Sequence, residues 1–326
     1  MTDPQSSEAP AAQPILSVII PVYNDGAVAV NAVRAVIASA EKNNISNIEI
    51  LCVEGGSTDD SAALIQEVCA SEPRARLVVC PSGAVAPKFN LGARHASADW
   101  LAFTESDCLP DTGWLAAWKR VIDDGRWNAC AGRVIAYSDD PNLQLSIRDS
   151  LERKEVTPGL LSKALSFYHG QGNNFLIRKQ LFIDVGGADE RLGAGAPGRS
   201  GQDAELNFRL LSAGETIGYE PDALVVHYPR ETRDSFLRKK KNYYYAGVWW
   251  ILVIHPCALS GWLALALRFI YPPLTGLFAL LTFNISRGRQ RWEEWKGFFS
   301  GVRDALTYRS EQSRKRRSLH DADEQG

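Results

Sequence analysis

No glycine-rich phosphate loop follows the first predicted strand of this chain of 326 residues. The missing G-x-G-x-x-G at that place disfavours an ordinary NAD-binding unit, and the absence of G-x-x-x-x-G-K-[ST] disfavours an ATP-type phosphate loop. The six cysteines include no C-x-x-C pair, and several lie in apolar runs where a thiol behaves as a small hydrophobic side chain. This cysteine usage is consistent with a reducing cytosol.

The chain also lacks an excess of charge of either sign, because its positive and negative side chains are nearly equal in number. The formal net charge is -2 and the pI is about 6.2, so no global basic field draws the chain to nucleic acid. Basic residues cluster from Arg287 onward, in RGRQRW and SRKRRS, which indicates either a solvated tail or a patch that faces anionic lipid. Residues 1–14 lack the charged-then-apolar order of a signal peptide, and we expect a short disordered leader there.

Apolar runs alternate with helical patterns in the first third of the chain, which is typical of a parallel sheet. The predicted strands are 16–20, 48–53, 76–80 and 100–104, and the predicted helices between them are 26–42, 59–71 and about 87–97. The pattern predicts an α/β fold with a Rossmann-like sheet. With 45% apolar and 23% charged residues, the chain is large enough for one such domain and an appendage.

A polar, turn-forming cluster follows each of the four predicted strands. The clusters are PVYND, EGGSTDD, PSG and ESD, in chain order. Ligands of open α/β sheets bind outside the carboxyl ends of the strands. One shared cleft at this edge is therefore the simplest interpretation.

Two places in the sequence offer acids for catalysis. Glu105 and Asp107 stand one residue apart at a strand end, where both can face a hard divalent cation; the alternative is a solvated turn in which Asp107 caps a helix. Asp203 begins a helix after the glycine-rich segment 193–201, where a carboxylate either caps the helix or accepts a proton from an acceptor hydroxyl.

Six motifs, in order, give the chain a resemblance to family 2 glycosyltransferases from residue 15 to about 230. They are SVIIPVYND, VEGGSTDDS, the K-x-N at 88–90, FTESDCLPDTGWL, GNNFLIRKQLFIDVGGADE and SGQDAELNFRLLSAG. The resemblance implies a GT-A fold, a mostly parallel sheet flanked by helices. It also implies transfer of a sugar from a nucleotide-diphosphate-sugar donor to an acceptor hydroxyl with inversion, assisted by Mn²⁺ or Mg²⁺.

The resemblance assigns roles to residues of this chain by motif position. Asp203 matches the general base, and Asp107, Glu105 and His227 match metal ligands. The glycine-rich loop 193–201 is expected to be a mobile lid that closes over the donor and excludes water. The residues implied in donor binding are Pro21, Tyr23, Asn24, Glu54, Gly56, Ser57, Lys88, Asn90, Glu105 and Ser106.

The chain departs from the family pattern at four positions. Glu54 and Gly55 stand where two aspartates are usual, Glu105 where aspartate is usual, and Gln202 where a glutamate commonly precedes the base. These departures keep open a catalytically silent nucleotide-sugar or glycan-binding scaffold at the membrane. A sugar-phosphate nucleotidyltransferase is the other alternative, although no basic glycine-rich loop follows the first strand.

After residue 230 the composition becomes aromatic and apolar. We predict a membrane-associating helical region over 231–286, with apolar segments at 246–267 and 269–285, and a basic helix and tail over 287–326. Pro256, Pro272 and Pro273 favour kinked or re-entrant helices over simple spans. Buried core helices are the alternative. Membrane association predicts a lipid-linked or polysaccharide acceptor on the cytoplasmic side of the cell membrane.

Overall fold

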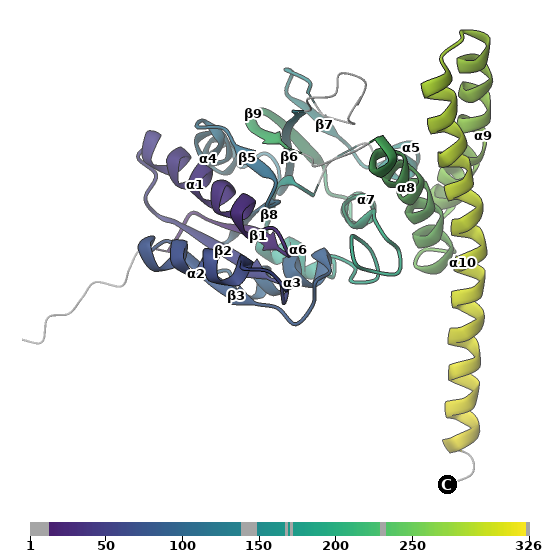
Figure 1. Cartoon of the computed structure of the whole chain (residues 1–326), viewed down its shortest axis with the longest axis horizontal. Coiled ribbons are helices and arrows are strands. Elements are labelled where there is room, and N and C mark those ends of the chain that lie inside the picture. Colours follow the sequence, from purple (N-terminus) through teal and green to yellow (C-terminus); the bar gives the residue numbers. More distant parts are fainter. Residues whose placement is uncertain (1–12, 138–148, 167–168, 170–171, 229–232, 324–326) are drawn as a thin grey trace, which may run out of the picture.

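A nine-stranded sheet forms the centre of the molecule (Figure 1). The computed structural model describes residues 13–137, 149–166, 169, 172–228 and 233–323, so nearly all of the predicted leader lies outside the described residues. The strand order is β3-β2-β1-β4-β8-β6-β9-β5, and β7 pairs with β9. Six of these strands share one direction, and β5, β7 and β8 run against them. The predicted mostly parallel sheet flanked by helices is confirmed.

The first half of the sheet follows the predicted alternation of strands and helices. Its elements are β1 (Leu16–Val22), α1 (Gly26–Lys42), β2 (Ile48–Glu54), α2 (Ser61–Ser71), β3 (Ala75–Val79), α3 (Val85–His95) and β4 (Trp100–Thr104). Helix α2 begins two residues later than predicted, because the Asp59 carboxylate accepts a hydrogen bond from the Ser61 amide at 3.0 Å and forms a turn before the helix.

The second half of the sheet contains antiparallel strands that the alternation does not predict. Its elements are β5 (Cys108–Pro110), α4 (Trp114–Asp124), β6 (Ala129–Ala136), β7 (Lys154–Val156), α5 (Leu160–Ala164), β8 (Asn174–Arg178), α6 (Lys179–Asp184), α7 (Gln202–Ser212) and β9 (Ile217–His227). Strand β5 pairs with the end of β9, with Cys108 opposite His227. This pairing brings the acids that follow β4 beside the end of β9.

Two apolar cores cover the two faces of the sheet. Val18 and Ile20 of β1 belong to the core that contains Trp114 of α4, whereas Ile19 belongs to the core that contains Phe89 of α3. Consecutive residues of a strand point to opposite faces, so one strand contributes to both cores. Burial on both faces fixes the position of the strand ends, from which the polar loops start.

Three helices follow the sheet and share a third apolar core. They are α8 (Arg233–Val253), α9 (Leu259–Leu281) and α10 (Ile285–Asp323). Trp249, Trp250 and Phe298 are buried in this core together with Phe208 of α7. Figure 1 shows α9 and α10 as a hairpin that projects beyond the start of α8. The three helices therefore form a unit that packs against the sheet through α7 and α5.

The predicted apolar segment 246–267 is not one helix. The chain leaves helical geometry between α8 and α9, at residues 254–258, where Pro256 has no amide hydrogen to continue the ladder. Helix α9 instead continues through Pro272 and Pro273 and joins the end of the first predicted segment to most of the second. Within the described residues, α9 is the helix long and apolar enough to cross a membrane by length and composition; only 28% of its most apolar window is buried.

Candidate active site

The loops after β1, β2 and β4 are joined by hydrogen bonds at one edge of the sheet. The Asn24 amide donates to Ser57 Oγ at 2.9 Å, and the Thr58 amide donates to Asn24 Oδ1 at 2.8 Å. Asn24 has a positive φ of 51°, which turns the chain sharply after the strand. The Ser106 hydroxyl donates to Asp25 Oδ2 at 2.8 Å. The three loops therefore form one connected rim.

Glu54 is buried at the end of β2 and shapes the loop that follows it. Its carboxylate accepts hydrogen bonds from the amides of Gly56 at 3.0 Å and Ser57 at 2.5 Å. Burial alone raises the pKa of Glu54, but these hydrogen bonds and the charge of Lys88 outweigh burial and hold the pKa below its ordinary value. Glu54 is therefore an anion that fixes the 55–57 loop, and its contact with a nucleotide base stays a prediction.

Lys88 lies under the same loops, with its ammonium group bonded to main-chain oxygens. Nζ donates to the carbonyls of Val22 at 3.2 Å and Gly83 at 3.1 Å. Burial lowers the pKa of Lys88 to about 8, against the opposing charges of Cys80, Glu54 and Glu105. The side chain thus ties two loops together, whereas the resemblance placed it near the donor phosphates.

Gly55 has no room for a side chain, which explains one departure from the family pattern. A Cβ at this position would stand 2.7 Å from the Ser82 carbonyl oxygen and 3.1 Å from Lys88 Nζ. Aspartate, usual here in the family, does not fit unless the 82–83 loop and Lys88 move. Nothing lies within 4 Å of a Cβ at Gly56, whose φ is +73°.

Tyr23 and Pro21 mark the start of the rim. Pro21 is buried within β1, opposite Val53 of β2. Tyr23 is 46% exposed, and its ring packs on Gly83, where a Cβ would approach to 2.8 Å. Lys88 Nζ lies 5.3 Å from the ring centroid. The exposed ring offers a flat surface on which a base can stack.

Asn90 is engaged with the turn that follows α6. Its amide nitrogen donates to the Ala188 carbonyl and to Glu190 Oε1, both at 2.9 Å, and its oxygen accepts from the Ala188 amide at 2.8 Å. These contacts make Asn90 a positioning residue for the G-G-A-D-E turn. Its predicted proximity to the donor phosphates stays a prediction.

Glu105, Asp107, Cys108 and His227 converge where β4 leads into β5. One ligand atom from each residue lies within 4.8 Å of all the others, and His227 Nε2 is 3.2 Å from Asp107 Oδ2. The β5–β9 pairing produces this group, because it sets Cys108 opposite His227. Burial and the nearby carboxylates raise the pKa of the Cys108 thiol, so Cys108 is a neutral neighbour rather than a thiolate ligand.

The protonation of the acidic group fits a cation site. Burial and the neighbouring Asp107 charge raise the pKa of Glu105 to about 7. Burial is the largest influence on Asp107 and opposes its ionisation, but the hydrogen bond and charge of His227, together with Cys108 and Lys239, outweigh burial and lower the Asp107 pKa. Two carboxylates and an imidazole suit a hard or borderline divalent ion, and such an ion would relieve the repulsion between the acids.

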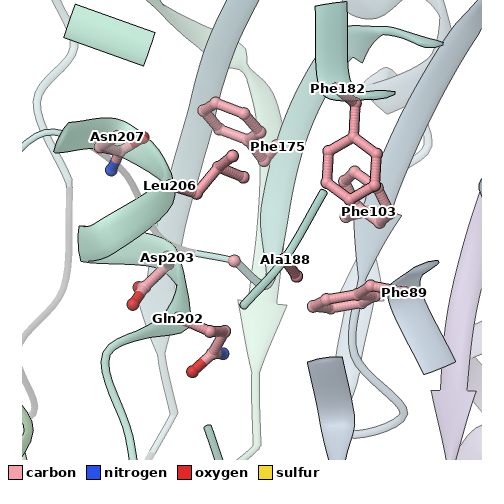
Figure 2. Close-up of a pocket in the computed structure, with 10 residues that line it drawn as sticks. Phe89, Phe103, Phe175, Phe182, Ala188, Gln202, Asp203, Leu206 and Asn207 are labelled. Carbon is pink, nitrogen blue, oxygen red and sulfur yellow. The ribbon is translucent and has the colours of Figure 1, made fainter. Parts of the chain in front are cut away.

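Asp203 stands in the first turn of α7, at the rim of an apolar cavity. Figure 2 shows Asp203 and Gln202 on one side and the phenylalanine rings of the sheet and neighbouring helices on the other. Asp203 Oδ1 accepts from the Ala204 amide at 2.9 Å. Burial raises the pKa of Asp203, although the amides of Ala204 and Gly172 oppose the shift. Its charge makes a small contribution to the raised pKa of Glu105, so the two acids interact electrostatically.

The glycine-rich segment 193–201, predicted to be a mobile lid, is a folded loop that contacts both sides of the site. Gly193, Gly195 and Gly201 have positive φ angles of 95°, 82° and 80°. The Ala194 carbonyl accepts from the Val85 amide at 3.2 Å. Arg199 lies 4.0 Å from the ring centroid of Tyr245 in α8. The loop therefore bridges α3 and the C-terminal helices, and its closure over a donor stays a prediction.

A buried ion network under α7 was not predicted. Glu205 is fully buried; Arg209 Nε donates to its Oε1 at 2.8 Å and Nη2 to its Oε2 at 2.7 Å. The same guanidinium donates to the carbonyls of Val185 and Gly187. His255 belongs to the break between α8 and α9, and its Nε2 lies 2.7 Å from Glu205 Oε1. The E-x-x-x-R spacing in α7 could have indicated the Glu205–Arg209 pair, but no local signal identifies His255.

Lys239 in α8 is the second residue that sequence reasoning missed at the site. Its positive charge lowers the pKa values of both Glu105 and Asp107. In the sequence, Lys239 is only one of the basic residues in the RKKK run. The packing of α8 against the sheet brings this charge to the acidic group.

Comparison with known sequences agrees with this geometry. The glycosyl transferase family 2 profile matches residues 17–186, more than half of the chain. The pre-mycofactocin glycosyltransferase of Mycobacterium tuberculosis (strain H37Rv) is 30% identical over 155 residues, which cover 46% of this chain and 31% of that protein. Glycosyltransferase AglE of Haloferax volcanii is 23% identical over 238 residues, covering 70% of this chain and 71% of AglE. The chain thus spans about a third of the mycobacterial relative.

Solved structures share the fold at low sequence identity. The mannosyltransferase PcManGT from Pyrobaculum calidifontis, in complex with GDP-Man and Mn²⁺, aligns with a TM-score of 0.58 and 17% identity over 91% of this chain and 88% of its own. S. aureus TarS in complex with UDP-GlcNAc aligns with a TM-score of 0.54 and 15% identity over 88% and 91%. These likenesses show the GT-A fold. The profile match shows that the chain belongs to glycosyltransferase family 2.

Proposed function

We propose that this protein transfers a sugar from a nucleotide-diphosphate-sugar donor to an acceptor hydroxyl by an inverting displacement that a divalent cation assists. The observation that carries the proposal is the convergence of Glu105, Asp107 and His227 within 4.8 Å. Neighbours of similar fold bind UDP-GlcNAc, or GDP-Man with Mn²⁺, at low identity to this chain. Mn²⁺ or Mg²⁺ is the proposed ion, held by Glu105, Asp107 and His227.

In this proposal Asp203 is the general base. Its carboxylate accepts the proton of the acceptor hydroxyl while the acceptor oxygen forms a bond to the anomeric carbon and the bond to the diphosphate oxygen breaks. Burial raises the pKa of Asp203, which makes the carboxylate a better proton acceptor near neutral pH. The bound ion supplies Lewis-acid stabilisation of the negative charge on the leaving diphosphate.

The rim residues orient the donor. Tyr23 stacks on the base, and the backbone of Gly56 and Ser57 lies where a ribose or phosphate can approach closely. Lys88 and Glu54 hold these loops through the contacts described above, while Asn90 fixes the 188–190 turn. Asn24 and Ser106 join the loops of β1, β2 and β4, so they set the width of the donor cleft.

We further propose that the acceptor is lipid-linked or a growing polysaccharide, and that the protein works at the cytoplasmic side of the cell membrane. The support is the apolar, mostly exposed α9 in a chain with free cysteines at every described cysteine position. The proposed units are a catalytic domain over 15–230, a membrane-associating region over 231–286 and a basic helix and tail over 287–326.

The test is calorimetric titration of the full-length protein with UDP and GDP, with and without Mn²⁺. We expect one nucleotide to bind more tightly when Mn²⁺ is present, and Asp107→Ala to abolish that dependence. The control Asp123→Ala removes an exposed carboxylate in an ion pair with Lys119 and should bind like the wild type. Metal-dependent binding justifies screening of the matching nucleotide sugars for turnover. If no nucleotide binds with any ion, the silent-scaffold alternative replaces the enzyme proposal.

A further inference from the structure

Helices α9 and α10 form an antiparallel hairpin whose exposed surface is largely apolar. Arg291 of α10 donates to the Tyr271 hydroxyl at 3.2 Å and packs beside Gly276, while Gly288 packs beside Leu280. These contacts pair residues 271–280 of α9 with residues 288–291 of α10. The first turns of α10 therefore run along the second half of α9, which contains the prolines.

The outer surface of the hairpin exposes apolar side chains from both helices. Leu274, Leu277 and Phe278 are 63%, 58% and 64% exposed, and Phe283 at the turn is 91% exposed. The α10 residues Ile285, Trp292 and Phe299, spaced seven apart, are 66%, 55% and 49% exposed. Single exposed apolar side chains are ordinary, but many large ones on two paired helices of a projecting hairpin mark an interaction surface.

Basic side chains surround this apolar surface. Arg287 and Arg289 are exposed in the first turns of α10, and Lys296 Nζ lies 5.7 Å from the Trp292 ring centroid. Arg238 is exposed near the start of α8, and this part of α8 lies beside the first third of α10, where Gly297 packs against the Lys241 carbonyl. Aromatic and apolar side chains edged by lysine and arginine fit the headgroup boundary of an anionic bilayer.

The charges of α10 argue against a transmembrane α9. If α9 crossed the hydrocarbon core with the hairpin intact, the adjacent part of α10 would enter it too. That part carries Arg287, Arg289, Arg291, Glu293, Glu294 and Lys296 within ten residues. Charged side chains are costly at the bilayer centre. The intact hairpin therefore favours a position in the interface, with the apolar surface inserted and the charges at headgroup depth.

We propose that the α9–α10 hairpin inserts its tip into one leaflet of an anionic membrane without crossing it. This inference rests on the proposed membrane association and specifies its mode and lipid class. Figure 1 shows that α8 starts on the side of the molecule where the tip projects, and this start lies six residues after His227 in the chain. Docking through the tip therefore brings the start of α8 toward the bilayer, where the proposed lipid-linked acceptor resides.

The first test is flotation of the full-length protein with vesicles of phosphatidylcholine, alone or mixed with phosphatidylglycerol. We expect stronger binding to the mixed vesicles. Leu274→Glu combined with Leu277→Glu should weaken it roughly a hundred-fold or more, because two inserted side chains are lost. The control Leu151→Glu, at a side chain 73% exposed on the catalytic part, should float like the wild type. Equal flotation of the hairpin variant and the wild type overturns the proposal.

The second test separates the basic edge from the apolar tip. Arg287→Gln with Arg289→Gln should lower affinity for the mixed vesicles by roughly five-fold per charge and leave binding to pure phosphatidylcholine unchanged. Nucleotide binding with Mn²⁺, measured on every variant, should stay at the wild-type value. A variant that loses vesicle binding but keeps nucleotide binding therefore tests the hairpin proposal alone. If the wild type itself binds no nucleotide, the proposed function fails, and the hairpin proposal is not affected.

The third test reports whether the tip crosses the bilayer. Ser286→Cys is introduced in a chain carrying Cys69→Ser and Cys257→Ser and bound to sealed vesicles that enclose a membrane-impermeant maleimide. We expect no labelling of Cys at this position, because the inserted tip does not reach the vesicle lumen. Labelling by the enclosed maleimide indicates a spanning α9 and overturns the proposal. So does a wild-type dimer in lipid-free solution that Leu274→Glu dissociates, because the surface would then bind a second copy.

Discussion

The sheet and the C-terminal helices bury their apolar residues in different ways. All seven residues of β1 are buried, and both faces of the strand are covered by helices. In α9 only 28% of the most apolar window is buried, and large side chains such as Leu274 and Leu281 stay exposed. The sheet thus completes its core within the chain, whereas the helices leave apolar area for a partner. The first region holds the candidate reaction site, and the second carries the surface that we propose attaches it to a membrane.

Side-chain contacts within the described residues link the two regions. Glu205 and Arg209 of α7 lie in the catalytic part, and His255 reaches them from the α8–α9 break. Since α7 also carries Asp203, the network fixes the helix of the proposed base against the attached helices. The loop 193–201 adds a second junction through Arg199 and Tyr245.

The largest effect should come from Asp203→Asn, which separates chemistry from attachment. We expect kcat to fall about 10²–10⁴-fold, the range for loss of a positioned general base, with nucleotide and vesicle binding unchanged. Steady-state kinetics, calorimetry and flotation measure the three quantities. If vesicle binding falls together with kcat, catalysis and attachment do not reside in separate regions.

The junction itself can be broken with Glu205→Ala. Removing one member of a buried ion network costs about 3–5 kcal/mol, because Arg209 stays buried without its partner. Denaturant unfolding measures the loss. Glu152→Ala, at a 79% exposed side chain paired with Lys154, is the control and should change stability by less than about 1 kcal/mol. His255→Ala should cost less than Glu205→Ala, since Arg209 keeps its carboxylate; equal costs would contradict the arrangement.

Gly55→Ala tests whether the departure at this position is enforced by packing on the catalytic side. The added Cβ would lie 2.7 Å from the Ser82 carbonyl oxygen, and we expect destabilisation of about 1–3 kcal/mol together with weaker nucleotide binding. Gly159→Ala is the matched control, because its Cβ would meet only the Ser162 hydroxyl, at 3.4 Å. Wild-type stability of the Gly55 variant would show that the loop accommodates a side chain without cost.

The smallest expected effect is a pH dependence of the free energy of unfolding that arises from Lys88 in the sheet region. The pKa of Lys88 is about 8 in the folded protein and has the ordinary lysine value of 10.5 in the unfolded chain. Between pH 8 and 10.5, Lys88 is therefore protonated in the unfolded chain and mostly neutral in the folded protein. The free energy of unfolding therefore gains a contribution that rises with pH, by at most about 1.4 kcal/mol per unit. This rise should be absent from Lys88→Met and kept in the control Lys119→Met, in denaturation series from pH 7 to about 10. An unchanged slope in Lys88→Met would mean that the ammonium is not desolvated.

Local patterns predicted the first half of the fold well and the second half poorly. Strand β4 and helix α1 have the predicted bounds, because their apolar periodicity reflects burial that is decided within a few residues. The antiparallel β8 and the short β5 depend on pairing with distant strands, which no local periodicity encodes. The break at Pro256 was visible as a proline, but its consequence depended on how α8 and α9 pack.

For the site, the sequence alone determined which chemical groups are available and at which strand ends they stand. Glu105, Asp107, Asp203 and the rim loops were recognised because motif spacing is a property of the chain itself. Tertiary structure decided which residues became their partners. The β5–β9 pairing brought His227 to Asp107, and the packing of α8 brought Lys239 near the acids. The break between α8 and α9 brought His255 to Glu205. Asp107 and His227 meet there although they are 120 positions apart, and only the folded chain sets the distances on which charge interactions depend.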